Sequence, residues 1–157
     1  MRRNMAAKKA YASLIESIPP IICLSGCVDC CCPVPFTAFE WRRVPASMKA
    51  NLDVRVLQTT SGTVWMAFRP GFLPENLDTS NIDMGQAMQG YNREESPGSC
   101  PFARPGTGCA IYAVRPLMCR LFGVVDHGLM RCLRGIVPDK MVRHEQALLV
   151  LAAFYGW

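Results

Sequence analysis

The segment CVDCCC, residues 27–32, places four cysteines in six positions, three of them consecutive. One further cysteine precedes it, so the first group consists of Cys23, Cys27, Cys30, Cys31 and Cys32. The remaining cysteines are widely spaced and form a second group, which consists of Cys100, Cys109, Cys119 and Cys132. Four thiolates are the usual ligand set of a tetrahedral zinc ion or of an iron–sulfur cluster. These residues therefore predict metal binding, with disulfides and thiol redox chemistry as the alternatives.

The N-terminal residues 1–18 bear on the choice between these alternatives. They carry several charges but no continuous apolar run, so we expect no signal peptide and place the protein in the cytoplasm. In that compartment, clustered cysteines usually bind metal or act in catalysis instead of forming structural disulfides. The odd number of nine cysteines also argues mildly against a closed disulfide framework. The longest apolar run, residues 147–157, is too short to cross a bilayer, so we expect no membrane association.

Neighbouring cysteines in the first group restrict which thiols can share one ion. Adjacent side chains point to opposite faces of an extended segment and lie about 100° apart on a helix. Cys30 and Cys31 can therefore bind the same small ion only if the backbone makes an unusual turn between them. Otherwise the two thiols bind at two different sites, or one of them is not a ligand. Setting Cys32 aside leaves eight cysteines, which divide into two sets of four. Because Cys27 and Cys30 alone would make an incomplete site, we expect the two groups to meet in space.

A thiolate-rich site carries negative charge and needs nearby N–H donors and cations. Arg115 and Arg120 flank Cys119, and two further arginines flank Cys132. We expect part of the formal net charge of +5 to compensate the site, with solvated surface arginines as the alternative. No basic run with interleaved aromatic residues occurs, so we expect no nucleic-acid partner.

The choice of metal stays open between zinc and an iron–sulfur cluster. Zinc is common in structural four-cysteine sites, but its ligand pairs are usually close in sequence, and only Cys27 and Cys30 offer that spacing cleanly. Iron–sulfur clusters are wider and accept scattered cysteines, and eight cysteines beside only two histidines favour soft, all-sulfur ligation. The chemistry leans toward an iron–sulfur cluster, with the 4Fe–4S type favoured. We expect His127 and His144 to be solvated or hydrogen-bonded side chains.

The elements that must position the cysteines follow from apolar periodicity and turn residues. Residues 5–18 have the apolar spacing of a helix. Residues 52–69 predict a β-hairpin that turns at Ser61–Gly62. Residues 70–99 are rich in Pro, Gly, Asn, Asp and Ser and predict mostly loop, while residues 138–154 predict a C-terminal helix.

A further short helix is predicted within residues 37–50, just after the first cysteine group. Thr37 can cap its N-terminus, Glu40 follows at the capping-box spacing, and Pro45 shortens or weakens the helix. Two roles stay open for Glu40: a helix cap, or a group that orients a cysteine or binds metal. The elements together predict a single domain over residues 1–157, a small irregular α+β fold organised by metal, with a β-hairpin and helices at both termini.

Two stretches of the chain carry a family signature: SGCVDCCCPVPFTAFE, residues 25–40, and CPFARPGTGCAIYAVRPLMCRLFG, residues 100–123. They resemble the YkgJ-type cysteine-cluster family of zinc- or iron-chelating domains. The family pattern is a C-x2-C-C element, a proline and an acidic residue, then C-P-F, Gly-Cys-x-Ile-Tyr, Arg-Pro and Cys-Arg. The positions that fit are Cys23, Cys27, Cys30, Cys31, Glu40, Cys100, Cys109, Ile111, Tyr112, Arg115, Pro116, Cys119, Arg120 and Cys132. Cys32 falls where the family commonly has another residue, and residues 41–99 lie outside the resemblance.

The resemblance implies a protein that binds metal through eight cysteines, without Cys32, in a structural, sensing or electron-carrying role. We expect four further residues to contribute to the cofactor environment: Glu40, Tyr112, Arg115 and Arg120. A relative of the same signature occurs in flagellin N-methylases, so an enzyme or accessory factor of protein modification is the second hypothesis. The sequence holds no recognisable S-adenosylmethionine pocket, which favours a non-enzymatic role. A protein partner stays open.

Overall fold

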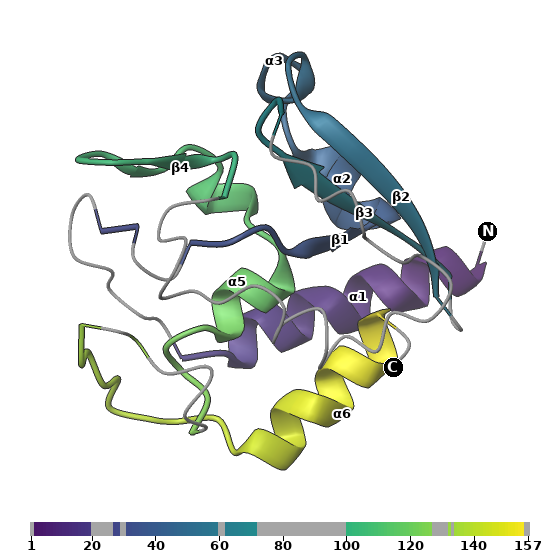
Figure 1. The fold of residues 1–157 in the computed structure, drawn as a ribbon. Coiled ribbons are helices and arrows are strands. Elements are labelled where there is room, and N and C mark those ends of the chain that lie inside the picture. The colour runs from purple at the N-terminus through teal and green to yellow at the C-terminus, as the bar shows by residue number, and fades with distance from the viewer. Residues whose placement is uncertain are drawn as a thin grey trace.

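The computed structural model has a small α+β fold with one three-stranded and one two-stranded antiparallel sheet (Figure 1). This confirms the predicted fold class. The residues that the structure describes are 2–19, 27–28, 31–59, 62–71, 100–126, 132 and 134–155. Most of the predicted loop at 70–99 lies outside them, as do Cys23, Cys30 and His127. Within the described ranges, no helix is long and apolar enough to cross a membrane.

The larger sheet contains the predicted hairpin as its two longer strands. β2 (Asp53–Thr59) pairs antiparallel with β3 (Gly62–Phe68), and the sheet order is β1-β3-β2. Thr59 pairs with Gly62, so Gly62 belongs to the strand, and its predicted place in a turn is wrong. Buried side chains of β3 alternate with less buried ones over Thr63–Met66, which orients one face of the sheet toward the core.

A third strand, β1 (Pro35–Thr37), connects the first cysteine group to this sheet. It pairs antiparallel with β3, with Phe36 opposite Trp65. Phe36 is buried and contacts Phe102 edge to face, with ring centroids 5.9 Å apart. The sequence did not predict β1, because three residues opening with a proline are too few to show the alternation of a strand.

Two short helices replace the single helix predicted at 37–50. α2 (Ala38–Arg43) ends before Pro45, and α3 (Ala46–Lys49) begins after it. The predicted capping box is present, because the Glu40 N–H donates to Thr37 Oγ1 at 3.3 Å and the Thr37 N–H donates to Glu40 Oε2 at 2.9 Å. Proline disfavours helical backbone in the residue before it, which explains the break at Val44.

Short elements form the second half of the fold, which carries three cysteines of the second group. β4 (Ala103–Arg104) and β5 (Gly108–Cys109) pair as a narrow ribbon, and Gly108 turns back into it with a φ of 90°. A 3-10 helix at Tyr112–Val114 and helix α5 (Leu117–Leu121) follow. Elements of two to five residues leave little periodic signal, so the sequence does not predict them.

The terminal helices are α1 (Arg2–Ser17) and α6 (His144–Tyr155). α1 confirms the N-terminal helix and begins before the predicted residue 5. The predicted start of the C-terminal helix near residue 138 is wrong. Val142 is held in an extended bridge, in which its N–H donates to the Val124 carbonyl at 2.7 Å, so the helix cannot begin before it.

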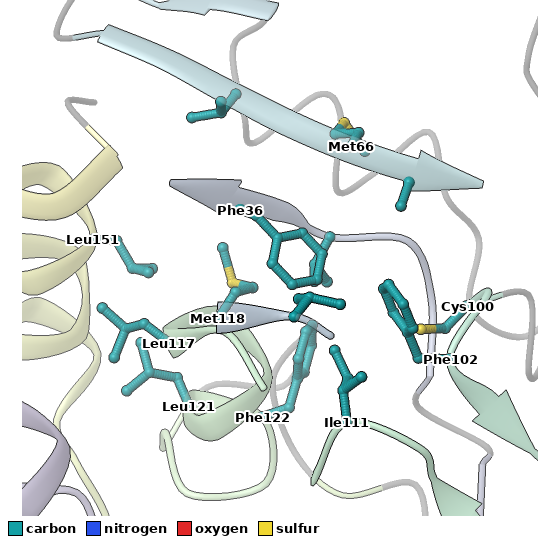
Figure 2. Packing of buried hydrophobic residues seen from close by; sticks show 14 of the residues in the cluster. Phe36, Met66, Cys100, Phe102, Ile111, Leu117, Met118, Leu121, Phe122 and Leu151 are labelled. Atoms are coloured by element: carbon teal, nitrogen blue, oxygen red, sulfur yellow. The ribbon is translucent and has the colours of Figure 1, made fainter. Parts of the chain in front are cut away.

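The hydrophobic core lies between the larger sheet and these helices. In the view of Figure 1, α1 and α5 lie between the sheet and α6. Leu117, Met118 and Leu121 of α5 are at most 1% exposed and point toward Phe36 of β1 and Leu151 of α6 (Figure 2). The short helix α5 is therefore the centre of the packing. Leu148 and Leu149 of α6 are exposed, and Ala147 and Leu151 are buried side chains of this helix.

Candidate metal centre

Every cysteine that the structure describes lines one cavity of about 220 Å³. These residues are Cys27, Cys31, Cys32, Cys100, Cys109, Cys119 and Cys132. None of these seven is disulfide-bonded. The cavity thus collects thiols from both cysteine groups, which confirms the expectation that the two groups meet in space. Six of the eight predicted metal ligands lie around it, and the remaining two, Cys23 and Cys30, lie outside the described residues.

A backbone hydrogen bond joins the two cysteine groups directly. The Cys100 N–H donates to the Cys31 carbonyl at 3.3 Å, and the Cys31 N–H donates to the Val28 carbonyl at 2.9 Å. Arg69 Nη2, at the end of β3, donates to the carbonyls of Cys100 at 3.4 Å and Ala103 at 3.2 Å. No motif in the sequence marks Arg69, so its contact with this turn is not predictable from the sequence. Its guanidinium fixes the turn that carries the first cysteine of the second group.

The β4–β5 ribbon and helix α5 position the next two cysteines. Cys109 is opposite Ala103 in the ribbon, and the Ala110 N–H donates to the Phe102 carbonyl at 2.9 Å. Cys119 is on α5 and lines the cavity, while Met118 and its apolar neighbours occupy the core. A helix separates adjacent side chains by about 100°, so α5 can serve core and cavity at once.

Arg115 is the arginine in the cavity wall, and it is one of the two that the sequence predicts beside the metal site. It lines the cavity, and its guanidinium lies 4.0 Å from the ring centroid of Tyr112. Its Nε is buried and has no hydrogen-bond partner within the part of the chain that the structure describes. A buried charged donor without an acceptor is costly, so this atom is suited to face an anionic group in the cavity.

Arg120 acts one step away from the cavity and does not line it. Its Nε donates to the Arg115 carbonyl at 3.2 Å, and its Nη2 donates to the Ala113 carbonyl at 2.9 Å. Two hydrogen bonds from one planar guanidinium hold the segment before α5 in place. Arg120 thereby fixes the backbone that carries Arg115.

Glu40 also lies outside the cavity lining and forms a buried network beneath α5. Its side chain is 1% exposed. Oε1 accepts from the Leu117 N–H at 2.7 Å and from the Tyr11 hydroxyl at 3.0 Å, while Oε2 accepts from the N–H and the hydroxyl of Thr37. The carboxylate therefore joins α1, α2 and the first residue of α5, two residues before Cys119. Of the two roles that the sequence left open, the helix cap is present, while a role in orienting a cysteine stays a prediction that the contact with α5 makes testable.

Burial raises the pKa of three thiols of the second group, those of Cys100, Cys109 and Cys119. Burial raises the pKa of Cys100 from 9.0 to about 12, and the thiols of Cys109 and Cys32 add to the effect as like charges. Burial also raises the pKa of Cys119 well above its ordinary value, with like-charge contributions from the thiols of Cys100, Cys32 and Cys109. Since metal ions bind the thiolate, a bound cation is the group that would reverse these shifts.

Hydrogen-bond donors and a cation oppose these shifts at individual sulfurs. The N–H groups of Phe102 and Ala103 lower the pKa of Cys100. Burial raises the pKa of Cys109, while the Ile111 N–H and the Arg115 charge lower it. Backbone N–H donors and an arginine beside the sulfurs are the surroundings that metal-bound thiolates need.

The residues around the cavity fit a thiolate-bound metal or cluster, because the candidate ligand atoms are all cysteine sulfurs and a cationic side chain lines the same cavity. Apart from the cysteines, the cavity wall is mainly apolar and includes Phe36, Phe102, Ile111 and Phe122. No three His, Cys, Asp or Glu side chains of the described residues have the spacing that would hold a single metal ion.

The comparison with protein families agrees with this site. The model of a family described as "CxxCxxCC: Putative zinc- or iron-chelating domain" matches residues 22–134. That range contains every cysteine of the chain and all four residues predicted to contribute to the cofactor environment. No curated protein and no solved structure matches the chain. The chain therefore belongs to the CxxCxxCC cysteine-cluster family of zinc- or iron-chelating domains.

Proposed function

We propose that the cavity binds an iron–sulfur cluster through cysteine thiolates, in a structural, sensing or electron-carrying role. The observation that carries the proposal is the convergence of seven cysteines from both groups on one cavity. Such a site needs reduced thiols, which is consistent with a cytoplasmic location. An iron–sulfur cluster supplies one-electron redox chemistry when bound, with a potential that the protein sets by charge, hydrogen bonds and burial.

The size of the cavity favours a cluster over a single zinc ion. One water molecule takes up about 30 Å³ of liquid, so about 220 Å³ corresponds to several atoms. A single zinc ion with four thiolates at about 2.3 Å would leave other cysteines around the cavity unused.

The surroundings favour a negatively charged group. Arg115 lines the cavity and its buried Nε has no hydrogen-bond partner among the described residues, and the Ile111 N–H and the Phe102 N–H act on cysteine sulfurs. Hydrogen bonds to sulfur and nearby cations raise the reduction potential of a cluster because they stabilise its more negative reduced state. Arg115 and these N–H groups are therefore the residues that would tune a bound cluster.

The experiment is anaerobic purification followed by analysis of iron, zinc and acid-labile sulfide, with a visible absorption spectrum. We expect a brown protein with a broad visible band and with iron and sulfide in comparable amounts. A colourless protein with stoichiometric zinc would replace the cluster with a zinc site. A protein that takes up neither metal, even after anaerobic reconstitution with iron and sulfide, would refute the proposal.

A further inference from the structure

Strand β2 forms one edge of the larger sheet and exposes side chains on both of its faces. The sheet order is β1-β3-β2, and among the described residues no strand pairs with the other side of β2 (Figure 1). Val54 is 36% exposed, Val56 is 51% exposed, and Arg55 between them is exposed as well. Successive side chains of a strand point to opposite faces, so Arg55 lies on the face opposite the two valines. This edge of the sheet is therefore open to solvent.

The sequence of β2 lacks the usual features that protect an edge strand from pairing. Soluble proteins commonly protect an edge with a short strand, a proline, a bulge or charged side chains, above all lysine. β2 has seven residues, contains no proline or lysine, and pairs with β3 at all seven positions without a bulge. Its two charged residues, Asp53 and Arg55, have opposite signs, so they do not repel every strand of the same sequence. The edge is thus suited to bind a further strand.

The residue pattern of β2 selects a second copy of the same strand as the partner. Asp53 and Arg55 flank Val54, so a two-fold axis at Val54 places Asp53 of each copy opposite Arg55 of the other. Opposite charges at facing positions stabilise a strand pair. On the other face, the same register places Val54 opposite Val54 and Val56 opposite Leu52, all of them apolar. One register therefore satisfies both faces of the strand.

The two neighbouring registers are less favourable. A two-fold axis at Arg55 would place two arginines opposite each other, and like charges at facing positions destabilise a strand pair. An axis at Val56 would place Arg55 opposite Leu57, which leaves the charge without a counterion. Arg55 has no hydrogen bond or ion pair within the part of the chain that the structure describes, so its charge is available to a second copy. Asp53 Oδ2 accepts from the Gly71 N–H at 2.9 Å, which holds this carboxylate at the edge.

We propose that the protein forms a homodimer in which the β2 strands of two copies pair antiparallel about a two-fold axis at Val54. The two three-stranded sheets then join into one continuous sheet. No residue of β2 lines the cysteine cavity, so the dimer contact lies outside the candidate metal centre. The contact is small and belongs to the weak class of interfaces, so we expect a dissociation constant of about 10–100 µM.

Sedimentation velocity of the full-length, metal-loaded protein between about 5 and 500 µM tests the proposal. We expect the wild-type protein to change from monomer to dimer over this range. Arg55→Asp places a carboxylate opposite Asp53 of the other copy, and we expect the dissociation constant to rise at least about tenfold. Arg42→Asp makes the same charge change on α2, outside β2, and we expect it to dimerise like the wild type. A wild-type protein that stays monomeric at the highest concentration would overturn the proposal.

Mixing two charge variants tests the register itself. Asp53→Arg has arginine at both charged positions and Arg55→Asp has aspartate at both, so each variant repels its own copy. An equal mixture restores both opposite-charge pairs, and we expect heterodimers with about the wild-type affinity. A mixture that does not associate, or an Arg55→Asp protein that dimerises like the wild type, would overturn the proposed interface.

Far-UV circular dichroism and metal content establish that each variant is folded. If Asp53→Arg does not fold, Val54→Lys takes its place, because Val54 is exposed and the substitution brings two ammonium groups together at the two-fold axis. We expect Val54→Lys to be monomeric over the whole concentration range. Dimerisation of Val54→Lys with the wild-type affinity would overturn the proposal.

Discussion

Substitution of Glu40 tests whether the buried network beneath α5 positions the metal site. The side chain is 1% exposed and accepts four hydrogen bonds, of which those from Tyr11 and Leu117 are fully buried. Glu40→Ala removes the acceptor from both buried donors, and each unsatisfied donor costs about 1–3 kcal/mol. The lost capping box with Thr37 adds about 1 kcal/mol.

The expected total loss for Glu40→Ala is about 3–7 kcal/mol, which is a large part of the roughly 5–15 kcal/mol that stabilises a typical domain. Glu40→Gln keeps one acceptor oxygen and nearly the same shape, so we expect about half of that loss. Glu16→Gln is the matched control, because Glu16 is exposed on α1, and we expect a change within about 0.5 kcal/mol.

Urea unfolding of the metal-loaded proteins, followed by far-UV circular dichroism, measures these differences. Metal content and the visible spectrum are recorded on the same samples, because a role in orienting Cys119 predicts that Glu40→Gln shifts the spectrum while the protein stays folded. A Glu40→Ala protein as stable as Glu16→Gln would refute the network. A destabilised Glu40→Gln protein with an unchanged spectrum would limit Glu40 to the packing of α1, α2 and α5.

Three further predictions concern the metal and its surroundings. Metal removal is expected to leave the protein largely unfolded, because metal binding at such sites supplies about 10–16 kcal/mol of apparent folding free energy. An unchanged far-UV circular dichroism spectrum and melting temperature after metal removal would contradict this prediction. The apparent metal affinity, measured by chelator competition, is expected to rise with pH from about 6.5 to 9 without levelling off. The reason is that burial raises the pKa of Cys100 to about 12, so metal binding must displace the thiol proton. An affinity that does not change with pH would contradict this prediction. Arg115→Gln is expected to lower the reduction potential of a bound cluster by about 60–130 mV, the equivalent of one charge-assisted hydrogen bond, because it removes the cation and the buried Nε. Arg42→Gln is the control, because Arg42 is an exposed arginine of α2. Equal reduction potentials in the two variants would exclude Arg115 from the site.

The sequence predicted the elements whose signals are local. The helix at the N-terminus, the hairpin of β2 and β3, and the capping box of Thr37 and Glu40 depend on short-range periodicity and on caps. The convergence of the two cysteine groups was predicted from ligand chemistry, because four thiolates must come from somewhere in the chain. The start of α6 was wrong because a tertiary bridge at Val142 overrides the local preference for helix.

Tertiary contacts determine the parts of the site that the sequence did not predict. Arg69 holds the Cys100 turn from 31 positions away, and Glu40 reaches the Leu117 N–H from 77 positions away. Neither contact leaves a spacing that a single sequence could reveal. Cys32 is the clearest case, since the family pattern leaves it without a role, while the fold places it in the lining of the cavity.

X-ray absorption spectroscopy at the iron and zinc edges of the anaerobically purified protein determines whether sulfur surrounds a bound metal. We expect a first shell that consists of sulfur, at a metal–sulfur distance of about 2.3 Å for zinc. For an iron–sulfur cluster we expect an additional iron–iron distance in the same spectrum. A first shell of nitrogen and oxygen only, or a metal-free protein whose cysteines are paired as disulfides, would contradict it.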